Sequence, residues 1–134
     1  MKEGRVLVAD DHAEVLESLR EMLAPLFEAV VTVADERSLH EVAERLKPEL
    51  AVVDLSLPVS DEVNVARRLK SQHPQLKVIM LSVHDEPAVV KAVLETGAVG
   101  FVLKRSAATD LIPAVQEALQ GRTYVSPGAR DHSR

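Results

Sequence analysis

The sequence predicts one doubly wound α/β domain, in which a parallel β-sheet is covered by helices on both faces. Short apolar runs that fit strands alternate along the chain with amphipathic stretches that fit helices. The run at residues 50–53 is apolar without alternation, which is typical of a strand buried on both faces. The links between elements are short, so we expect right-handed crossovers between parallel strands.

Five strands are expected, and each is a short apolar run rich in Val, Leu or Ala. The third run is followed by Leu57-Pro58, which favours an extended or turning backbone and places Asp54 at the carboxyl end of its strand. The expected strands cover residues 5–9, 29–34, 50–54, 77–81 and 100–103.

The first two expected helices are amphipathic. In the first, apolar residues recur at three- and four-residue steps from His12 until the chain approaches Pro25. We expect Ser38 to cap the second helix, with Glu41 as its capping-box partner and Pro48 as its end.

The remaining helices are bounded by polar residues, Pro or Gly. A polar loop at residues 60–61 is expected to open the third helix, which ends before Pro74. We expect Asp85 to cap the fourth helix and Gly97 to end it in a left-handed conformation. Gly121 is expected to end the fifth helix.

Taken together, these elements predict the flavodoxin-like arrangement of five parallel strands in the order 2-1-3-4-5. We assign residues 1–125 to this domain and residues 126–134 to a C-terminal tail or the start of a linker.

The composition argues against several kinds of partner. The 134 residues carry a formal net charge of -5 and only three Phe or Tyr residues, so we expect no direct nucleic-acid binding by this chain. There is no Cys, which excludes a thiolate metal site and a Cys nucleophile. The N-terminus has no signal-like apolar core and no run is long enough to span a membrane, so we expect a cytoplasmic protein without a membrane partner.

Four of the five expected strands end on residues that can take part in chemistry. They are Asp10 with Asp11, Asp54, Ser82 and Lys104. In a parallel sheet of the expected order, these residues meet at one edge. Clustered carboxylates favour a hard divalent cation such as Mg²⁺, and a carboxylate beside a hydroxyl and an ammonium can attack a phosphoryl group.

These motifs, in this order and at these spacings, resemble the receiver domain of two-component response regulators, whose fold is also called CheY-like. The motifs are Asp10-Asp11, residues 54–58, Leu81-Ser82 and residues 101–104, and the resemblance covers about residues 5–125. Residues 9–12, 81–85 and 120–127 are most similar to the subtype that usually precedes a LuxR/NarL-type helix-turn-helix DNA-binding domain.

The resemblance implies a role for each residue of the site. Asp54 would accept a phosphoryl group from a sensor histidine kinase, and Asp11, Asp54 and the backbone carbonyl of Ser56 would hold Mg²⁺. Asp10 would support the metal through water, and Lys104 would pair with the phosphoryl group.

The resemblance also implies that phosphorylation switches a protein-contact face. Ser82 would move toward the phosphoryl oxygens and Phe101 would rotate inward behind it. We expect no enzyme activity beyond self-phosphotransfer and autodephosphorylation, a possible homodimer, and control of transcription through a DNA-binding domain absent from this chain.

The chain departs from the family pattern at three positions. Glu62 stands where most members have Gly, which predicts a different and more acidic turn. Val83 is larger than the small residue that often follows the hydroxyl, and Arg105 replaces a frequent Pro, so a trans peptide bond is expected after Lys104.

Simpler interpretations exist for the same residues. Asp54 could cap a turn, Asp10 and Asp11 could cap a helix, and Phe101 could be plain core. Alternative functions are a stand-alone receiver or adaptor, a degenerate receiver that only binds a partner, and a Mg²⁺-dependent phosphatase similar to the haloacid dehalogenase group. The phosphatase motif normally has a second Asp two residues after the nucleophile, and this chain has Ser56 there.

Overall fold

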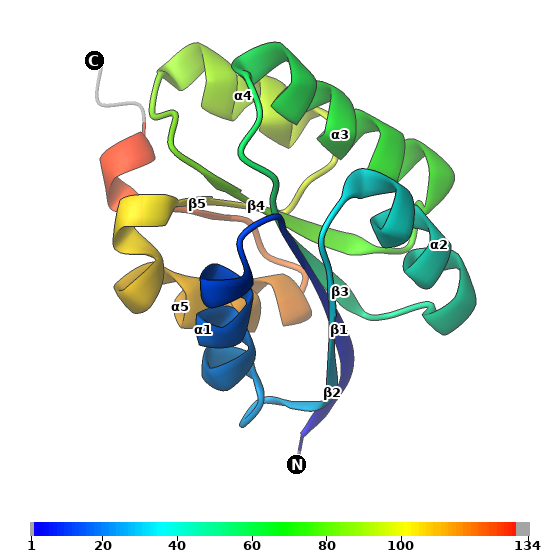
Figure 1. Cartoon of the computed structure of the whole chain (residues 1–134). Helices are drawn as coiled ribbons and strands as arrows, with labels where there is room; N and C mark the ends of the chain where they lie inside the picture. Colours follow the sequence, from blue (N-terminus) through cyan, green and yellow to red (C-terminus); the bar gives the residue numbers. More distant parts are fainter. Residues whose placement is uncertain (1, 131–134) are drawn as a thin grey trace.

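The computed structural model describes residues 2–130 and contains one six-stranded parallel sheet (Figure 1). The strand order is β2-β1-β3-β4-β5-β6, so the predicted order of the first five strands is confirmed. The strands are β1 (Glu3–Asp10), β2 (Phe27–Val33), β3 (Leu50–Asp54), β4 (Lys77–Ser82), β5 (Gly100–Leu103) and β6 (Tyr124–Val125).

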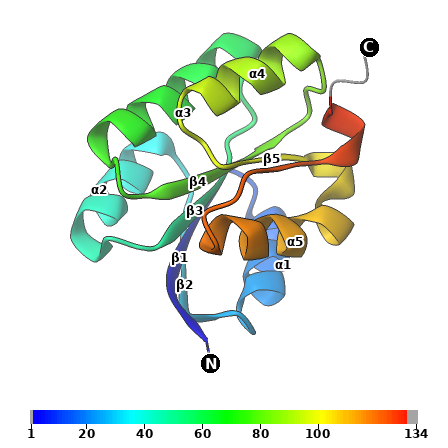
Figure 2. The ribbon, with the colours of Figure 1, turned by 180° about the vertical axis from the view of Figure 1, so that it is seen from behind.

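Five α-helices cover the two faces of this sheet. α2, α3 and α4 pack on one face, and α1 and α5 pack on the other (Figures 1 and 2). They are α1 (Ala13–Leu23), α2 (Glu36–Leu46), α3 (Val59–Gln72), α4 (Pro87–Glu95) and α5 (Ala107–Leu119), with short 3₁₀ turns η1 (Lys104–Ser106) and η2 (Pro127–Ala129).

The alternation of side chains along β1 divides the core into two layers. Leu7 and Ala9 pack with α2 and α3, whereas Val6 and Val8 pack with α1 and α5. All five residues of β3 are buried, as the unbroken apolar run predicted. The core therefore fixes the strands on both faces and leaves their carboxyl ends at one edge.

The capping predictions for α2 and α4 were wrong. α2 begins at Glu36, and the side chain of Asp35 caps it by accepting a hydrogen bond from the backbone N–H of Ser38 at 2.7 Å. Ser38 therefore lies inside the helix and its N–H is capped, because the helix starts three positions earlier than expected. Asp85 lies outside the first turn of α4 and instead contacts Arg105 at 3.4 Å.

Some further boundaries differ from the predicted ones, and one strand was not expected. β2 begins at Phe27 rather than at residue 29, and α3 begins directly after Pro58. β6 was not expected, because two residues give too short an apolar pattern to recognise. The C-terminal stops of α4 and α5 are confirmed, since Gly97 and Gly121 adopt positive φ angles of 105° and 79°.

Residues beyond β6 pack against the domain. Ser126 is fully buried, and its hydroxyl donates to Asp110 Oδ2 at 2.8 Å and accepts from the Leu103 N–H at 3.0 Å. Ala129 is also buried. The predicted end of the domain at residue 125 stays a prediction, and the last described residues lie against β5. Within residues 2–130, no helix has the length and apolar character needed to cross a bilayer.

Candidate functional site

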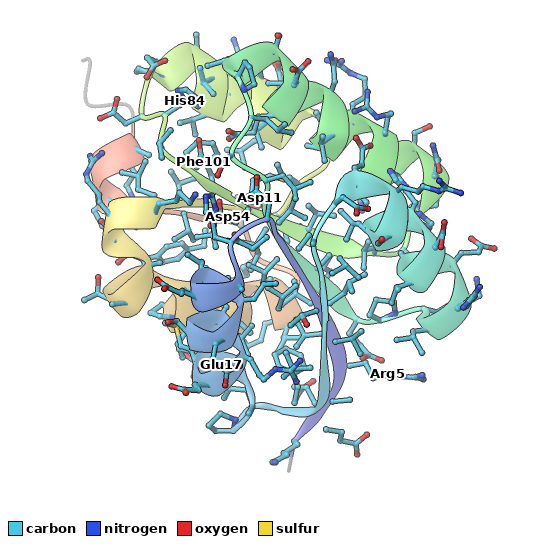
Figure 3. The ribbon with its side chains drawn as sticks, in the orientation of Figure 1. Arg5, Asp11, Glu17, Asp54, His84 and Phe101 are labelled. Atoms are coloured by element: carbon cyan, nitrogen blue, oxygen red, sulfur yellow. The ribbon has the colours of Figure 1, made fainter. Side chains whose placement is uncertain are left out.

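Four neighbouring strands place polar side chains at one edge of the sheet. Asp10 ends β1, Asp54 ends β3, Ser82 ends β4 and Lys104 follows β5. The register pairs Asp10 with Asp54 across β1 and β3, and Ser82 with Leu103 across β4 and β5. Figure 3 shows Asp11 and Asp54 together at this edge, with His84 in the loop that leads to α4. The predicted convergence of these strand ends is therefore present.

Asp54 is a buried carboxylate with an ammonium partner. Its side chain is 3 % exposed, and Lys104 Nζ lies 2.7 Å from its Oδ1. Burial and the neighbouring Asp10 carboxyl raise the pKa of Asp54 to about 7, although Lys104 opposes this shift. Burial lowers the pKa of Lys104, but Asp54, Asp10 and Asp11 together raise it above its usual value. Lys104 is therefore the positive charge that neutralises this buried acidic pair.

Asp10, Asp11 and His12 form a compact group of possible metal ligands. One ligand atom from each of the three side chains lies within 4.8 Å of the others. Asp10 Oδ1 accepts from the His12 N–H at 2.7 Å, while Asp10 Oδ2 is buried and has no hydrogen-bond partner. An unpartnered buried carboxylate oxygen beside further carboxylates fits a hard cation with oxygen ligands. His12 Nδ1, 2.9 Å from Asp11 Oδ1, joins this group. His12 was not among the predicted site residues, because nothing in the sequence shows that its ring lies beside the acids.

A cavity of about 240 Å³ opens beside Asp54. Lys104 donates to the Ser56 hydroxyl at 3.4 Å, and the Ser56 hydroxyl donates to Asp11 at the same distance. Ser82 is 1 % exposed and lines the cavity with Asp54 and Lys104. The site therefore joins a carboxylate, an ammonium and two hydroxyls around one space.

Phe101 lies in β5 and is fully buried. Its register partners are Met80 in β4 and Val125 in β6. The aromatic ring is thus already packed inward behind the strand ends, within the core layer that contains α3 and α4.

Glu62 is part of this site, although the sequence suggested only an altered turn. It lies in the first turn of α3, where its N–H donates to the Pro58 carbonyl at 3.0 Å. Its side chain lines the same cavity as Asp54 and Ser82, and the residue is 6 % exposed. Glu62 lies inside α3, because this helix already begins at Val59.

The structure also describes the other two positions at which the chain departs from the family pattern, Val83 and Arg105. Val83 lines the cavity mouth and is 65 % exposed, so its side chain stands in solvent. The peptide bond after Lys104 is trans, as expected, since residues 2–130 contain no cis peptide bond.

Comparisons with known proteins agree with this geometry. A family model described as the response regulator receiver domain matches residues 6–116. The chain is 35 % identical over 125 residues to the transcriptional regulatory protein DegU of Brevibacillus brevis, covering 92 % of this chain and 53 % of DegU. It is 35 % identical over 126 residues to a probable transcriptional regulatory protein NarL of Mycobacterium tuberculosis, covering 92 % and 58 %.

Solved structures give the same result. The isolated receiver domain of RcsB from Salmonella enterica serovar Typhimurium superposes with a TM-score of 0.83 at 28 % identity, covering 96 % of both chains. A LuxR-family response regulator from Aurantimonas superposes with a TM-score of 0.83 at 27 % identity, covering 93 % of this chain and 91 % of that one.

The chain spans little more than half the length of the curated relatives it matches. The predicted resemblance to the NarL-type subtype is confirmed by these relatives. The family match covers most of the chain, and the strand order and the acidic strand ends agree with it. This chain belongs to the response regulator receiver domain family.

Proposed function

We propose that the chain is a phosphorylation switch in which Asp54 accepts a phosphoryl group from the phosphohistidine of a sensor kinase. A carboxylate oxygen of Asp54 forms the new P–O bond while the P–N bond of the phosphohistidine breaks. The observation that carries this proposal is the position of Asp54, buried at the end of β3, 2.7 Å from Lys104 Nζ and open to the 240 Å³ cavity.

Mg²⁺ is the cation that suits the acidic end of this site. Asp11, Asp54 and the backbone carbonyl of Ser56 would hold it, with Asp10 acting through water. The unpartnered Oδ2 of Asp10 supports this assignment. When bound, the cation supplies positive charge against the oxygens of the phosphoryl group.

Lys104 and Ser82 act on the phosphoryl oxygens. The ammonium of Lys104 pairs with Asp54 in the resting protein and is close enough to pair with a phosphoryl group on the same carboxylate. The Ser82 hydroxyl accepts from the His84 N–H at 3.0 Å, so its movement also moves the loop before α4. Phe101, the second predicted switch residue, is buried in the core layer that contains α3 and α4. The phosphoryl charge thereby shifts the population toward a second arrangement of α4 and β5.

The output of this switch is a protein contact that controls transcription. Relatives over the same residues are named as transcriptional regulatory proteins, and one RcsB structure is a complex with DNA. We propose that the receiver regulates a separate DNA-binding domain, with the kinase and a second receiver as protein partners. Its own chemistry is limited to taking up and losing the phosphoryl group, in the cytoplasm where such kinases present it.

Intact-mass measurement with acetyl phosphate and Mg²⁺ tests the proposal. We expect one acid-labile phosphoryl adduct on the parent chain and none on the Asp54→Asn variant. Chelation of Mg²⁺ should abolish the adduct in the parent. An equal adduct on the Asp54→Asn variant would remove Asp54 from the acceptor role.

A further inference from the structure

Glu62 places an additional carboxylate in the phosphoacceptor cavity. The residue is 6 % exposed, and it lines the same cavity as Asp54, Ser82 and Lys104. An acidic residue in the first turn of a helix commonly faces solvent, where it interacts with the helix dipole. Glu62 is instead buried, so its position needs another explanation.

The carboxylate of Glu62 is only partly satisfied. Glu62 Oε1 is buried without a hydrogen-bond partner. The Nε2 atom of His84, a residue just after Ser82 in the chain, is also buried without a hydrogen-bond partner. Burial raises the pKa of Glu62, although Ser82, His84 and Lys104 lower it. A buried carboxylate with so few donors is costly and responds strongly to a further negative charge.

The hydroxyl of Ser82 has a single proton to donate. Its oxygen accepts from the His84 N–H at 3.0 Å, and Ser82 lines the cavity together with Lys104 and Glu62. A phosphoryl group on Asp54 would enter the same cavity and need the same donors. The Glu62 carboxylate and the phosphoryl group therefore compete for this space and its few donors.

We propose that the buried Glu62 carboxylate opposes entry of the phosphoryl group into this cavity, by its negative charge and by competing for the donors that line the cavity. This inference rests on the proposed function of Asp54. Uptake of the phosphoryl group then requires the Glu62 side chain to leave the cavity, because the two negative charges repel each other. The first turn of α3 thus sets a threshold for switching, because part of the favourable free energy of the phosphoryl group in the site is offset by the cost of displacing Glu62.

Binding of beryllofluoride, a phosphoryl analogue, tests this competition by titration in the presence of Mg²⁺. We expect Glu62→Ala to bind the analogue about tenfold more tightly than the parent, which corresponds to about 1.4 kcal/mol. Glu62→Gln keeps the shape and removes the charge, and we expect it to gain roughly threefold or more. Should the Ala variant fold poorly, the Gln variant decides the result.

Two controls separate competition from a general structural effect. Glu86→Gln removes one exposed carboxylate near Glu62 without emptying the cavity, and we expect less than about a twofold change. Mg²⁺ affinity measured without beryllofluoride should be the same in the parent and in both Glu62 variants, whereas general loosening of the site would change it.

The outcomes distinguish this inference from the proposed function. Equal or weaker analogue binding by both Glu62 variants, with normal binding by the parent, overturns the role of Glu62 and leaves Asp54 as the acceptor. Absence of analogue binding in every chain overturns both. If the Glu62 variants bind the analogue more tightly, and this binding is lost when Asp54→Asn is introduced into the same chain, the result supports both the role of Glu62 and the proposed function.

Discussion

Asp54 destabilises the folded chain when it is ionised and no cation is bound. Burial and the Asp10 carboxyl raise its pKa from 3.8 to about 7. Between these pH values the folded state binds more protons than the unfolded state, so the free energy of unfolding falls as pH rises through this window. The cost is fully present above about pH 7 and absent below the unfolded pKa.

The Asp54→Asn variant should therefore be more stable than the parent at pH 8 without Mg²⁺. We expect its free energy of unfolding to be higher by about 2 kcal/mol, because the amide removes a buried charge at similar volume. Urea denaturation at pH 8 and pH 4 measures this, and the difference should shrink at pH 4. A less stable Asn variant at pH 8 would contradict the account.

Lys104 has the opposite effect on stability. Its ammonium is the positive charge 2.7 Å from Asp54, so Lys104→Ala leaves a buried acidic pair without neutralisation. We expect a loss of about 1–3 kcal/mol at pH 8 in urea denaturation. Lys91→Ala, at an exposed position of α4, is the matched control and should change stability by less than about 0.5 kcal/mol. Equal effects of the two substitutions would argue against the pair.

At the scale of elements, a chain of polar contacts joins α2 to α3. Arg68 on α3 donates two hydrogen bonds of 2.7 Å to Glu36 on α2, and Glu36 lies 3.0 Å from His40. The other ring nitrogen of His40 lies 3.2 Å from His73, which follows α3. Burial, His40 and Lys47 lower the pKa of His73, while Glu44 opposes this. The network requires His73 to be neutral.

Acidification should therefore weaken the α2–α3 contact. The pKa of His73 in the folded state lies below the unfolded value of 6.5, so the stability contributed by its neutral form is lost as pH falls below 6.5. Substituting His73→Gln should flatten the pH dependence of the free energy of unfolding in this window by less than about 1 kcal/mol, since the site is partly screened by solvent. If NMR shows that the pKa of His73 lies above 6.5 in the folded protein, the expected direction of this pH dependence is contradicted.

β5 depends on the residues that follow β6. Ser126→Ala would leave the Leu103 N–H and one Asp110 oxygen without their partner in the buried region. We expect a loss of about 2–3 kcal/mol in urea denaturation. Ser18→Ala, at an exposed hydroxyl of α1, is the control and should change stability by less than about 0.5 kcal/mol. If Ser126→Ala lowers the free energy of unfolding by no more than the control does, Ser126 does not belong to the cooperative folding unit.

Across the whole molecule, the sequence predicted what depends on repeated apolar patterns and could not predict what depends on tertiary packing. The strand order followed from alternating strands and helices, and the meeting of Asp54 with Lys104 followed from that order. Asp35 rather than Ser38 caps α2, because both residues suit a cap and only the helix start decides between them. The burial of Glu62 was not predictable, since it depends on how α3 packs over the cavity.

Location of the phosphoryl group on the chain tests the central claim most directly. After reaction with acetyl phosphate and Mg²⁺, borohydride reduces an aspartyl phosphate to homoserine, and peptide mass spectrometry then locates the changed residue. The account predicts homoserine at position 54 alone. Homoserine at position 10 or 11, or reduction of Glu62 to 5-hydroxynorvaline, in place of homoserine at position 54 would contradict it, because the acceptor would then be a different carboxylate of the same site.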